Sequence, residues 1–403
     1  MTVLAIDQGT TSTRAFRVED DGTMQPVGQH RHRVFLPRPG WVEHDAAELL
    51  EAIRALIAAA GPVDRVGIAN QGETVLAWHA TTKQPLGRAI VWQDTRTQGA
   101  IERLRADGHE AFVRARAGLP LDPYFSAAKL RWLLDHTPDA RALLAAGLLR
   151  LGTTDAFFLD ALTSTFATDP STASRTSLLD IASLRWDDAL CALFGVPVAC
   201  LPPIRDTVGG FGRLPGGIPV AASVVDQQAA LRGHFCREPG DLKITFGTGG
   251  FALALTGALH RDATGLLPTC AWSVGGRAEY ALDGGITTAG AAVDWLRRVG
   301  LLERADALDA ARGPSAASQG VFFVPAQAGL GCPHHDRTAR ALWIGMGLDT
   351  TRETLCRAVL EGVALRAAEL VAIFAAALGG VLRRLSVDGG LTRSAAFTRF
   401  LAD

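Results

Sequence analysis

The chain has 403 residues and a hydrophobic fraction of 48%, and its 40 Lys and Arg against 41 Asp and Glu leave a net charge of −1. Such a length predicts about two or three domains with cores of their own. The balanced charge argues against a nucleic-acid-binding protein and a polybasic membrane-surface protein. The six cysteines lack the CxxC spacing of zinc sites, so we expect reduced thiols and a cytoplasmic protein. The longest apolar run, Leu370 to Leu382, is too short for a membrane span.

The first distinctive stretch joins two predicted strands through a polar turn. An apolar run at residues 3–6 leads into Asp7-Gln8-Gly9-Thr10-Thr11-Ser12-Thr13-Arg14, and another apolar run follows at 15–18. Such a turn points backbone N–H groups and small hydroxyls into one concavity, which suits phosphate oxygens. Asp7 stands where it can hold Mg²⁺ through water, and Arg14 can offset negative charge. The alternative interpretation is an ordinary polar β-turn.

Two further short strands are predicted to end in polar segments, after a helix capped near Asp45. The strand at 66–69 ends in Asn70-Gln71-Gly72-Glu73-Thr74, and the strand at 89–92 ends in Gln93-Asp94-Thr95-Arg96-Thr97. Ligands collect at the carboxyl ends of strands in open α/β sheets. Both segments are therefore candidate site loops.

Helical patterns follow at 100–105 and 110–117, and a further helical segment begins near Ser126. Later in the chain, a strand that stops at Val225 delivers Asp226 to the start of a helix. At this position the side chain of Asp226 can act as a helix N-cap.

The second half, which we place from Cys236, repeats the design of the first. A β-branched run at 243–246 leads into Gly247-Thr248-Gly249-Gly250, and apolar residues follow at 251–255. Further on we expect a long helix at 351–378 and a strand at 385–387, which ends in Asp388-Gly389-Gly390. Two such loops, far apart in the sequence, suggest two related half-molecules that each present a loop to one nucleotide.

Taken together, these motifs resemble those of the FGGY carbohydrate kinases, within the sugar kinase, Hsp70 and actin superfamily, and most closely the glycerol kinase branch. Tyr124-x-Ser126-x-x-Lys129-x-x-Trp132 fits the first signature segment of that family. The resemblance extends nearly from end to end. The matching segments are 7–15, 39–45, 90–97, 122–136, 173–176, 226–231, 246–251, 329–333 and 387–390.

The resemblance implies an α/β fold of two ribonuclease-H-like (actin-like ATPase) domains with a catalytic cleft between them. Residues 1–235 would carry the acceptor substrate and the first phosphate loop, and residues 236–403 the nucleotide. Family members usually continue past the Asp-Gly-Gly segment and its helix through another strand and two helices. We therefore expect a second domain that is truncated at its C-terminus.

The implied reaction is ATP- and Mg²⁺-dependent phosphorylation of a small-molecule hydroxyl, with Asp226 as general base and Asp7 and Asp226 flanking the metal. The resemblance assigns acceptor binding to Glu73, Trp92, Tyr124, Asp226, Gln227 and Phe251. It assigns nucleotide binding to Thr10, Thr11, Ser12, Arg14, Gly247, Thr248, Gly290, Gly389 and Gly390. Trp92 and Phe251 as plain core aromatics remain the alternative, and a homodimer is a fair expectation.

One position departs from the family pattern. Glycerol kinases normally read Asn-Gln-Arg-Glu-Thr where this chain has Gly72 before Glu73. The family's Arg hydrogen-bonds two substrate hydroxyls, and each such charge-assisted bond is worth ~1.5–3 kcal/mol. Without it, Glu73 and Asp226 would be a poorly compensated like-charge pair. Three hypotheses therefore stay open: a kinase of glycerol or a related small polyol, a kinase of a larger polyol or sugar, and a catalytically weak polyol-binding or regulatory relative.

Overall fold

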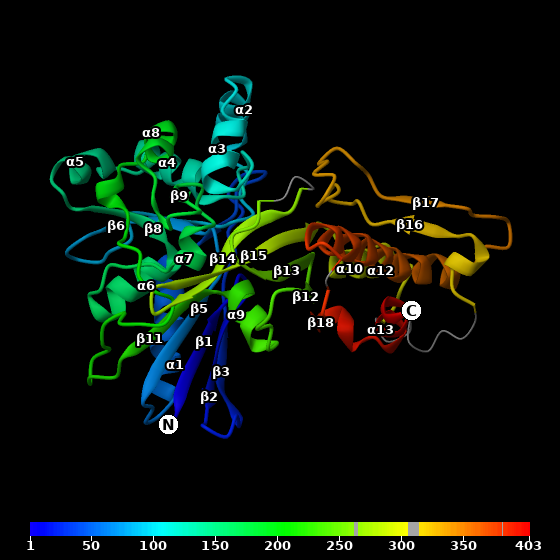
Figure 1. Cartoon of the computed structure of the whole chain (residues 1–403), viewed down its shortest axis with the longest axis horizontal. Helices are drawn as coiled ribbons and strands as arrows, with labels where there is room; N and C mark the ends of the chain where they lie inside the picture. Colours follow the sequence, from blue (N-terminus) through cyan, green and yellow to red (C-terminus); the bar gives the residue numbers. More distant parts are fainter. Residues whose placement is uncertain (262–264, 305–313, 381) are drawn as a thin grey trace. The chain divides into compact units, whose positions relative to one another are not determined.

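The computed structural model describes residues 1–261, 265–304, 314–380 and 382–403. They form two compact units (Figure 1). The first unit comprises Met1–Ala230 and Thr269–Tyr280, and the second comprises Leu231–Pro268 and Ala281–Asp403. Within the described ranges, no helix is both long and apolar enough to cross a membrane.

The first unit is built on a five-stranded sheet with the order β11-β5-β1-β2-β3. Its strands are β1 (Val3–Gln8), β2 (Ser12–Val18), β3 (Met24–Arg31), β5 (Arg65–Asn70) and β11 (Val220–Val225). Burial alternates along β1, with Leu4 and Ile6 in the core, as a strand covered on one face requires. Helix α1 (Ala46–Ala59) covers that face with Leu49 and Ile53, in one cluster with the strand residues.

Three strands of this sheet run parallel, and their register decides where the site lies. β1 pairs in parallel with β5, and Gln8 stands opposite Asn70. β11 also pairs in parallel with β5, and Val225 stands opposite Asn70. The segments that follow these three residues therefore leave the sheet at the same end, where the carboxyl ends of the parallel strands lie.

The remaining elements of the first unit are short strands and helices. A four-stranded sheet has the order β4-β7-β6-β8, and a two-stranded sheet pairs β10 with β9. The strands are β4 (Glu43–His44), β6 (Val75–His79), β7 (Ala89–Ile90), β8 (Leu149–Thr153), β9 (Leu179–Asp180) and β10 (Arg185–Trp186). The helices are α2 (Gln98–Ala106), α3 (Glu110–Ala117), α4 (Ser126–His136), α5 (Ala140–Ala145), α6 (Thr154–Thr163), α7 (Pro170–Ala173), α8 (Asp188–Phe194), η1 (Val198–Cys200) and α9 (Asp226–Gly233), which ends in the second unit.

The second unit is built on a sheet with the order β14-β15-β13-β12-β18. Its strands are β12 (Asp241–Phe246), β13 (Gly250–Gly257), β14 (Leu267–Val274), β15 (Arg277–Ile286) and β18 (Arg384–Gly389). The outer part of the β14–β15 hairpin, Thr269–Tyr280, belongs to the first unit. β12 is antiparallel to β13 and parallel to β18, so Phe246 and Gly389 end neighbouring strands.

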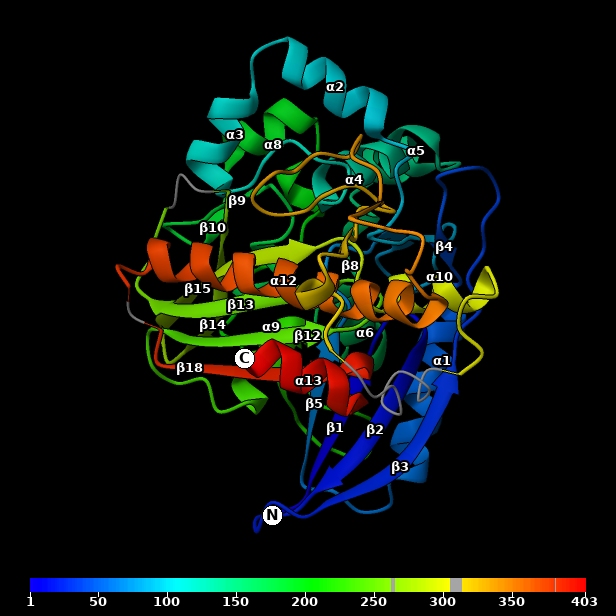
Figure 2. The same cartoon turned by 90° about the vertical axis from the view of Figure 1, so that its right-hand side faces the viewer.

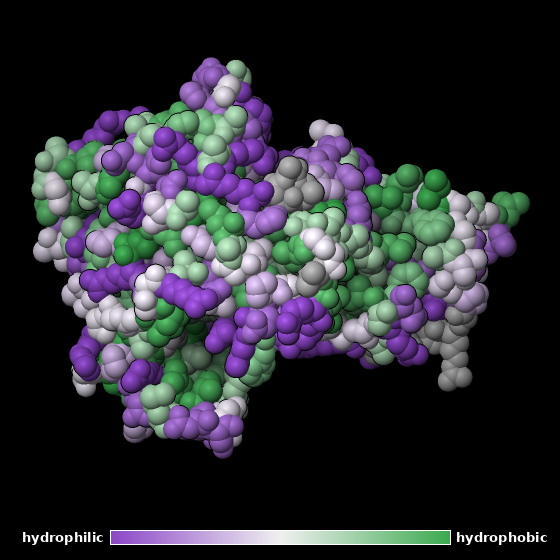
Figure 3. Space-filling model, viewed as in Figure 1, coloured by the Kyte–Doolittle hydropathy of each residue, from purple (hydrophilic) through white to green (hydrophobic). Residues whose placement is uncertain are grey.

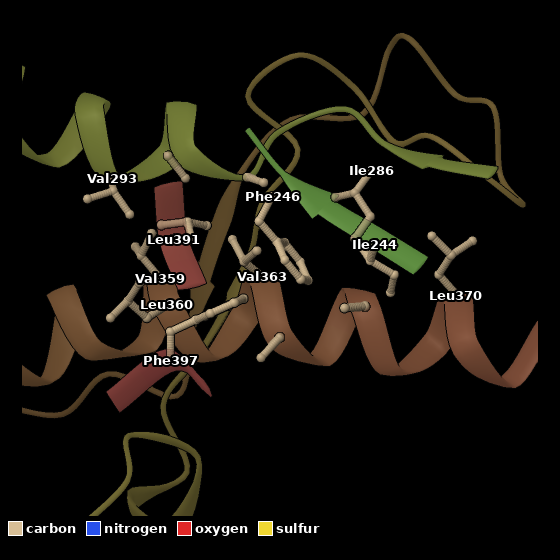
Figure 4. Packing of buried hydrophobic residues seen from close by; sticks show 14 of the residues in the cluster. Ile244, Phe246, Ile286, Val293, Val359, Leu360, Val363, Leu370, Leu391 and Phe397 are labelled. Atoms are coloured by element: carbon tan, nitrogen blue, oxygen red, sulfur yellow. The ribbon is translucent and has the colours of Figure 1, made fainter. Parts of the chain in front are cut away.

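One long helix contributes more buried residues to the core of the second unit than any other described element. Helix α12 (Arg352–Ala377) begins at the N-cap Thr351, whose side chain accepts the N–H of Thr354. The helix covers one face of the sheet and lies in front of it in Figure 2. Val363 and Leu370 pack with Ile244 and Phe246 of β12 (Figure 4). The other described elements are α10 (Gly290–Arg298), η2 (Ala317–Gln319), β16 (Phe322–Val324), β17 (Leu342–Ile344), η3 (Gly390–Arg393) and α13 (Ala395–Ala402).

Candidate active site

The turn between β1 and β2 is closed by its own backbone. The N–H of Gly9 donates to the carbonyl of Ser12 at 3.0 Å, and Asp7 and Arg14 face each other across the two strands. The Arg14 guanidinium donates to Asp7 Oδ2 at 2.6 Å, and both side chains are partly exposed. The turn therefore presents Thr10, Thr11 and Ser12 beside one cation and one carboxylate.

This donor set bears on the expected Mg²⁺. Within the described part of the chain, no group of three His, Cys, Asp or Glu is arranged to hold a metal ion. Mg²⁺ keeps several waters and is usually held by one or two carboxylates together with substrate phosphates. A single partly exposed carboxylate at the phosphate turn fits a metal that arrives with a nucleotide as part of the substrate.

The turn that follows β5, at the same end of the sheet, is fixed by two backbone hydrogen bonds. Gln71 N–H donates to the carbonyl of Gln8 at 2.7 Å, and Thr74 N–H donates to the carbonyl of Gly72 at 2.7 Å. Glu73 is buried, 4% exposed, and has a φ of +58°. A residue with a side chain rarely adopts this conformation, and strain of this kind gathers at functional sites.

The carboxylate of Glu73 is paired with an arginine from a distant part of the chain. Arg175 Nε donates to Glu73 Oε1 at 2.6 Å, and the two side chains are 7% and 6% exposed. The expectation that Glu73 is poorly compensated without an arginine at position 72 is therefore wrong. Sequence reasoning matched residues 173–176 to the family but gave Arg175 no role, because nothing local indicates its partner 102 positions away.

Trp92 connects the expected acceptor site with the phosphate turn. Its Nε1–H donates to Thr10 Oγ1 at 2.9 Å, and its backbone N–H donates to Thr74 Oγ1 at 3.2 Å. The Trp92 ring meets the Tyr124 ring edge-on, with 5.5 Å between their centroids. Thr10, Thr74, Trp92 and Tyr124 therefore form one contiguous group.

The backbone beside Tyr124 is fixed by a buried lysine. Lys129 Nζ donates to the carbonyls of Pro123 and Tyr124, at 3.3 and 2.5 Å. The side chain is fully buried, and this burial lowers the pKa of Lys129 to about 8, although nearby carboxylates, Glu73 first among them, oppose the shift.

Asp226 stands at the carboxyl end of the parallel strands. It follows Val225, which lies opposite Asn70 of β5, and it is the first residue of α9. Its Oδ1 accepts the N–H of the next residue, Gln227, at 2.7 Å, and the N-cap interpretation stays a prediction. Val225 N–H is held by Ser171 Oγ at 3.1 Å, which fixes the chain where Asp226 emerges.

In the second unit, three glycine-containing segments converge. Gly290 N–H donates to the carbonyl of Gly247 at 2.8 Å, and Ala289 N–H donates to the carbonyl of Thr248 at 2.9 Å. A Cβ at Gly290 would lie 2.5 Å from that carbonyl of Gly247. At Gly389, which has a φ of +98°, a Cβ would collide with the carbonyl of Phe246. Close backbone approach therefore requires glycine at both positions.

The predicted site residues thus form two groups, one in each unit. The first unit holds Asp7, Thr10, Thr11, Ser12, Arg14, Glu73, Trp92, Tyr124, Asp226 and Gln227. The second holds Gly247, Thr248, Phe251, Gly290, Gly389 and Gly390. The individual roles of these residues stay predictions.

Known proteins resemble the chain along its entire length. A glycerol kinase of Alkalilimnicola ehrlichii is 44% identical over 418 residues, which cover 100% of this chain and 84% of the relative. A glycerol kinase of Thermus brockianus is also 44% identical, with coverage of 100% and 84%. The Plasmodium falciparum glycerol kinase solved with ADP superposes with a TM-score of 0.93 at 32% identity, again covering 100% and 84% of the two chains.

Family models match both halves of the sequence. The N-terminal domain model of the FGGY family of carbohydrate kinases matches residues 2–233, and the C-terminal domain model matches residues 242–403. A xylulose kinase of Rhodospirillum rubrum has the same fold, with a TM-score of 0.86 at 26% identity over 100% of this chain and 84% of the other. These matches confirm the expected α/β fold of the sugar kinase and actin type, whereas the expected C-terminal truncation stays a prediction. The chain belongs to the FGGY family of carbohydrate kinases.

Proposed function

We propose that the protein is an ATP-dependent kinase that phosphorylates a hydroxyl of glycerol or a related small polyol. The observation that carries the proposal is the hydrogen bond of 2.9 Å from Trp92, a candidate acceptor residue, to Thr10 of the phosphate turn. Phosphoryl transfer needs the acceptor hydroxyl and the phosphates side by side, and this bond connects a residue proposed for each. The glycerol kinase relatives, at 44% identity, support the choice of acceptor.

In the proposed reaction, the acceptor hydroxyl attacks the γ-phosphoryl group of Mg²⁺·ATP, and Asp226 takes the hydroxyl proton. Asp7 and Asp226 contact the metal that enters with ATP, and Arg14 offsets phosphate charge. Residues 1–235 supply the acceptor site and the first phosphate turn. Residues 236–403 bind the nucleotide, with Gly247 and Thr248 at its phosphates and Gly290, Gly389 and Gly390 near its nucleoside and α-phosphate.

In the proposed acceptor site, Glu73, Asp226 and Gln227 hydrogen-bond the hydroxyls, and Trp92, Tyr124 and Phe251 cover the carbon skeleton. Tyr124 is well placed for this because its ring already meets that of Trp92 at 5.5 Å. Holding the acceptor and the phosphates in one orientation supplies much of the rate enhancement in such transfers.

A second candidate function, the phosphorylation of a larger polyol or sugar, is favoured by Gly72. A Cβ at this position would lie 3.3 Å from Cγ1 of Val225, the residue before Asp226. A side chain at position 72 would therefore start beside the proposed base. Without one, the acceptor site loses a cation of the glycerol kinase pattern and keeps more volume for a longer substrate.

The test is an ADP-release assay with Mg²⁺·ATP against glycerol, erythritol, dihydroxyacetone, xylulose and ribitol. We expect turnover highest with glycerol, and ~10²–10⁴-fold lower turnover for Asp226→Asn with ATP binding retained. A clear preference for xylulose or ribitol, which Gly72→Arg shifts toward glycerol, would instead establish the second candidate. ATP binding without turnover of any polyol would contradict both and favour a polyol-binding or regulatory relative.

The proposed enzyme acts in the cytoplasm on small molecules. All six cysteines are free and buried, and burial raises the pKa of Cys191 to about 12, so the thiols suit a reducing compartment. We also propose a homodimer, because exposed apolar side chains gather on β16 and β17 (Figure 3), among them Leu342 and Ile344 at 53% and 56% exposure. Light scattering that gives the monomer mass would contradict the dimer.

A further inference from the structure

Arg175 is fixed in place before it reaches Glu73. It follows α7, whose N-cap Asp169 accepts the N–H groups of Ser171 and Thr172. Its own N–H donates to the carbonyl of Thr172 at 3.0 Å. Its guanidinium carbon lies 5.3 Å from the centroid of the Phe125 ring and 5.8 Å from that of Tyr124. A planar guanidinium held beside two aromatic rings loses little further freedom when it binds a carboxylate.

Glu73 is equally constrained on its own side. Its φ of +58° belongs to a tight turn, and Ser126 Oγ donates to its carbonyl at 3.2 Å. Its carboxylate can therefore adjust only through its side-chain torsions. A buried carboxylate is costly unless it is paired, and the 2.6 Å bond from Arg175 Nε meets that cost.

The same arginine touches two elements of the proposed acceptor site. It bonds to Glu73 and lies over the ring of Tyr124, which in turn meets Trp92. Lys129 on α4 is a second cation beside Glu73, and the other charges that act on this lysine are the carboxylates of Asp94 and Asp122 and the guanidinium of Arg96. Lys129 donates to backbone carbonyls, whereas Arg175 donates to the Glu73 carboxylate itself.

We propose that Arg175 is a positioning residue for acceptor recognition, which keeps Glu73 ionised and aimed to accept the hydroxyls of the substrate. In this chain Arg175 balances the negative charge of Glu73, because position 72 holds glycine in place of the arginine of the glycerol kinase pattern. The inference rests on the proposed function and adds to it a residue that acts through Glu73. A carboxylate accepts several hydrogen bonds, so the bond from Arg175 is compatible with one from a substrate hydroxyl.

The experiment compares Arg175→Met and Arg175→Lys with the wild type. The KM for the acceptor and for ATP are measured between about pH 5 and pH 6.5, more than one pH unit below the pKa of Lys129, which is about 8. Arg116→Met is the matched control, because Arg116 also pairs with a buried carboxylate, that of Asp187, and lies over an aromatic ring, that of Phe112. Acceptor Kd by calorimetry gives a readout that does not depend on turnover.

We expect Arg175→Met to raise the acceptor KM and Kd about 10- to 100-fold at pH 6. The loss should shrink as the pH rises, because a carboxylate without its cation is ionised more fully at higher pH. The ATP KM should change less than about twofold. The acceptor KM and Kd of Arg175→Lys should lie between those of the wild type and of Arg175→Met. In an Arg175→Ala variant, added guanidinium ion should partly restore acceptor binding.

Other results would overturn the inference. A purely structural role predicts equal losses for acceptor and ATP, no pH trend, and the same behaviour in Arg116→Met. An unchanged acceptor Kd in a folded Arg175→Met protein would also end it. If the wild type neither phosphorylates nor binds any polyol, the proposed function fails and the inference fails with it, whereas an active wild type with unaffected Arg175 variants removes the inference alone.

Discussion

Single residues in and beside the proposed acceptor-substrate site have an unusual backbone conformation or a buried charge. Glu73 has a positive φ and Lys129 is fully buried. Each feature costs free energy by itself, of order 1–3 kcal/mol for a strained backbone. The surrounding contacts offset these costs: Arg175 pairs with Glu73, and two backbone carbonyls accept from Lys129. These residues therefore hold polar atoms in a fixed arrangement that lowers the stability of the fold unless the surrounding contacts are present.

Lys129 gives a prediction for the pH dependence of stability. In the folded protein its pKa is lowered to about 8 from 10.5, so between these values the unfolded chain binds more protons. The free energy of unfolding should therefore rise with pH in this window, by about 1 kcal/mol per pH unit. More than about one pH unit below 8, both states hold the proton and the contribution is flat.

Urea unfolding of the wild type and Lys129→Met, at several pH values from 7 to 10, measures this effect. Methionine keeps an unbranched side chain that is one atom shorter and has no proton to lose, so the stability of the variant should lack the upward trend. Parallel curves for the two proteins would show that Lys129 is not the source.

At the scale of elements, the parallel strands and the glycine contacts set the positions of the loops. β1, β5 and β11 end in register, which brings the segments after Gln8, Asn70 and Val225 to one end of the sheet. In the second unit, β12 and β18 end in register at Phe246 and Gly389. The Gly389 backbone then passes so close to the carbonyl of Phe246 that no side chain fits.

Gly389→Ala tests this close approach. The Cβ would collide with the Phe246 carbonyl, so β18 and the turn after it must move. We expect the ATP KM to rise about tenfold or more, with a loss of ~1–3 kcal/mol of stability, while acceptor Kd is unchanged. Gly380→Ala is the matched control: its φ of +86° is similar, but a Cβ would have open space. An equal rise of ATP KM in both variants would contradict the steric explanation.

The sequence predicted elements better than it predicted their contacts. The turn after β1, the polar end of β5 and the helix that starts at Asp226 all lie where local patterns indicate them. β6 and β14 were not predicted, because β6 follows the turn at 70–74 at once and β14 mixes small and polar residues among its apolar ones. The pairs Glu73–Arg175 and Trp92–Thr10 join residues 102 and 82 positions apart, and no local pattern specifies such a pair.

At the scale of the whole molecule, each unit has a core of its own. One cluster contains Leu4, Ile53 and Phe157 of the first unit, and another contains Ile244, Val363 and Phe397 of the second. Separate cores predict that the units lose structure in separate steps. Two-state analysis of the entire chain is then inappropriate.

Scanning calorimetry should therefore resolve two transitions. Acceptor at about 100 times its Kd should stabilise the first unit by about 2.7 kcal/mol, and Mg²⁺·ATP should act mainly on the second. Gly389→Ala identifies the second unit's transition by lowering its midpoint. A single transition that both ligands shift equally would show that the units unfold together.

The hairpin of β14 and β15 has a consequence for how this protein folds during its synthesis. Residues 269–280 complete the first unit, yet they are synthesised after residues 231–268 of the second. Until they emerge from the ribosome, Ser174 and Gln228 lack the hydroxyl of Thr269, and Asp206 lacks that of Ser273. A nascent chain usually folds its domains in order of synthesis. Here the earlier unit must wait for part of the later one, so translation speed through residues 231–280 sets how long its unfinished surface is open to chaperones and proteases.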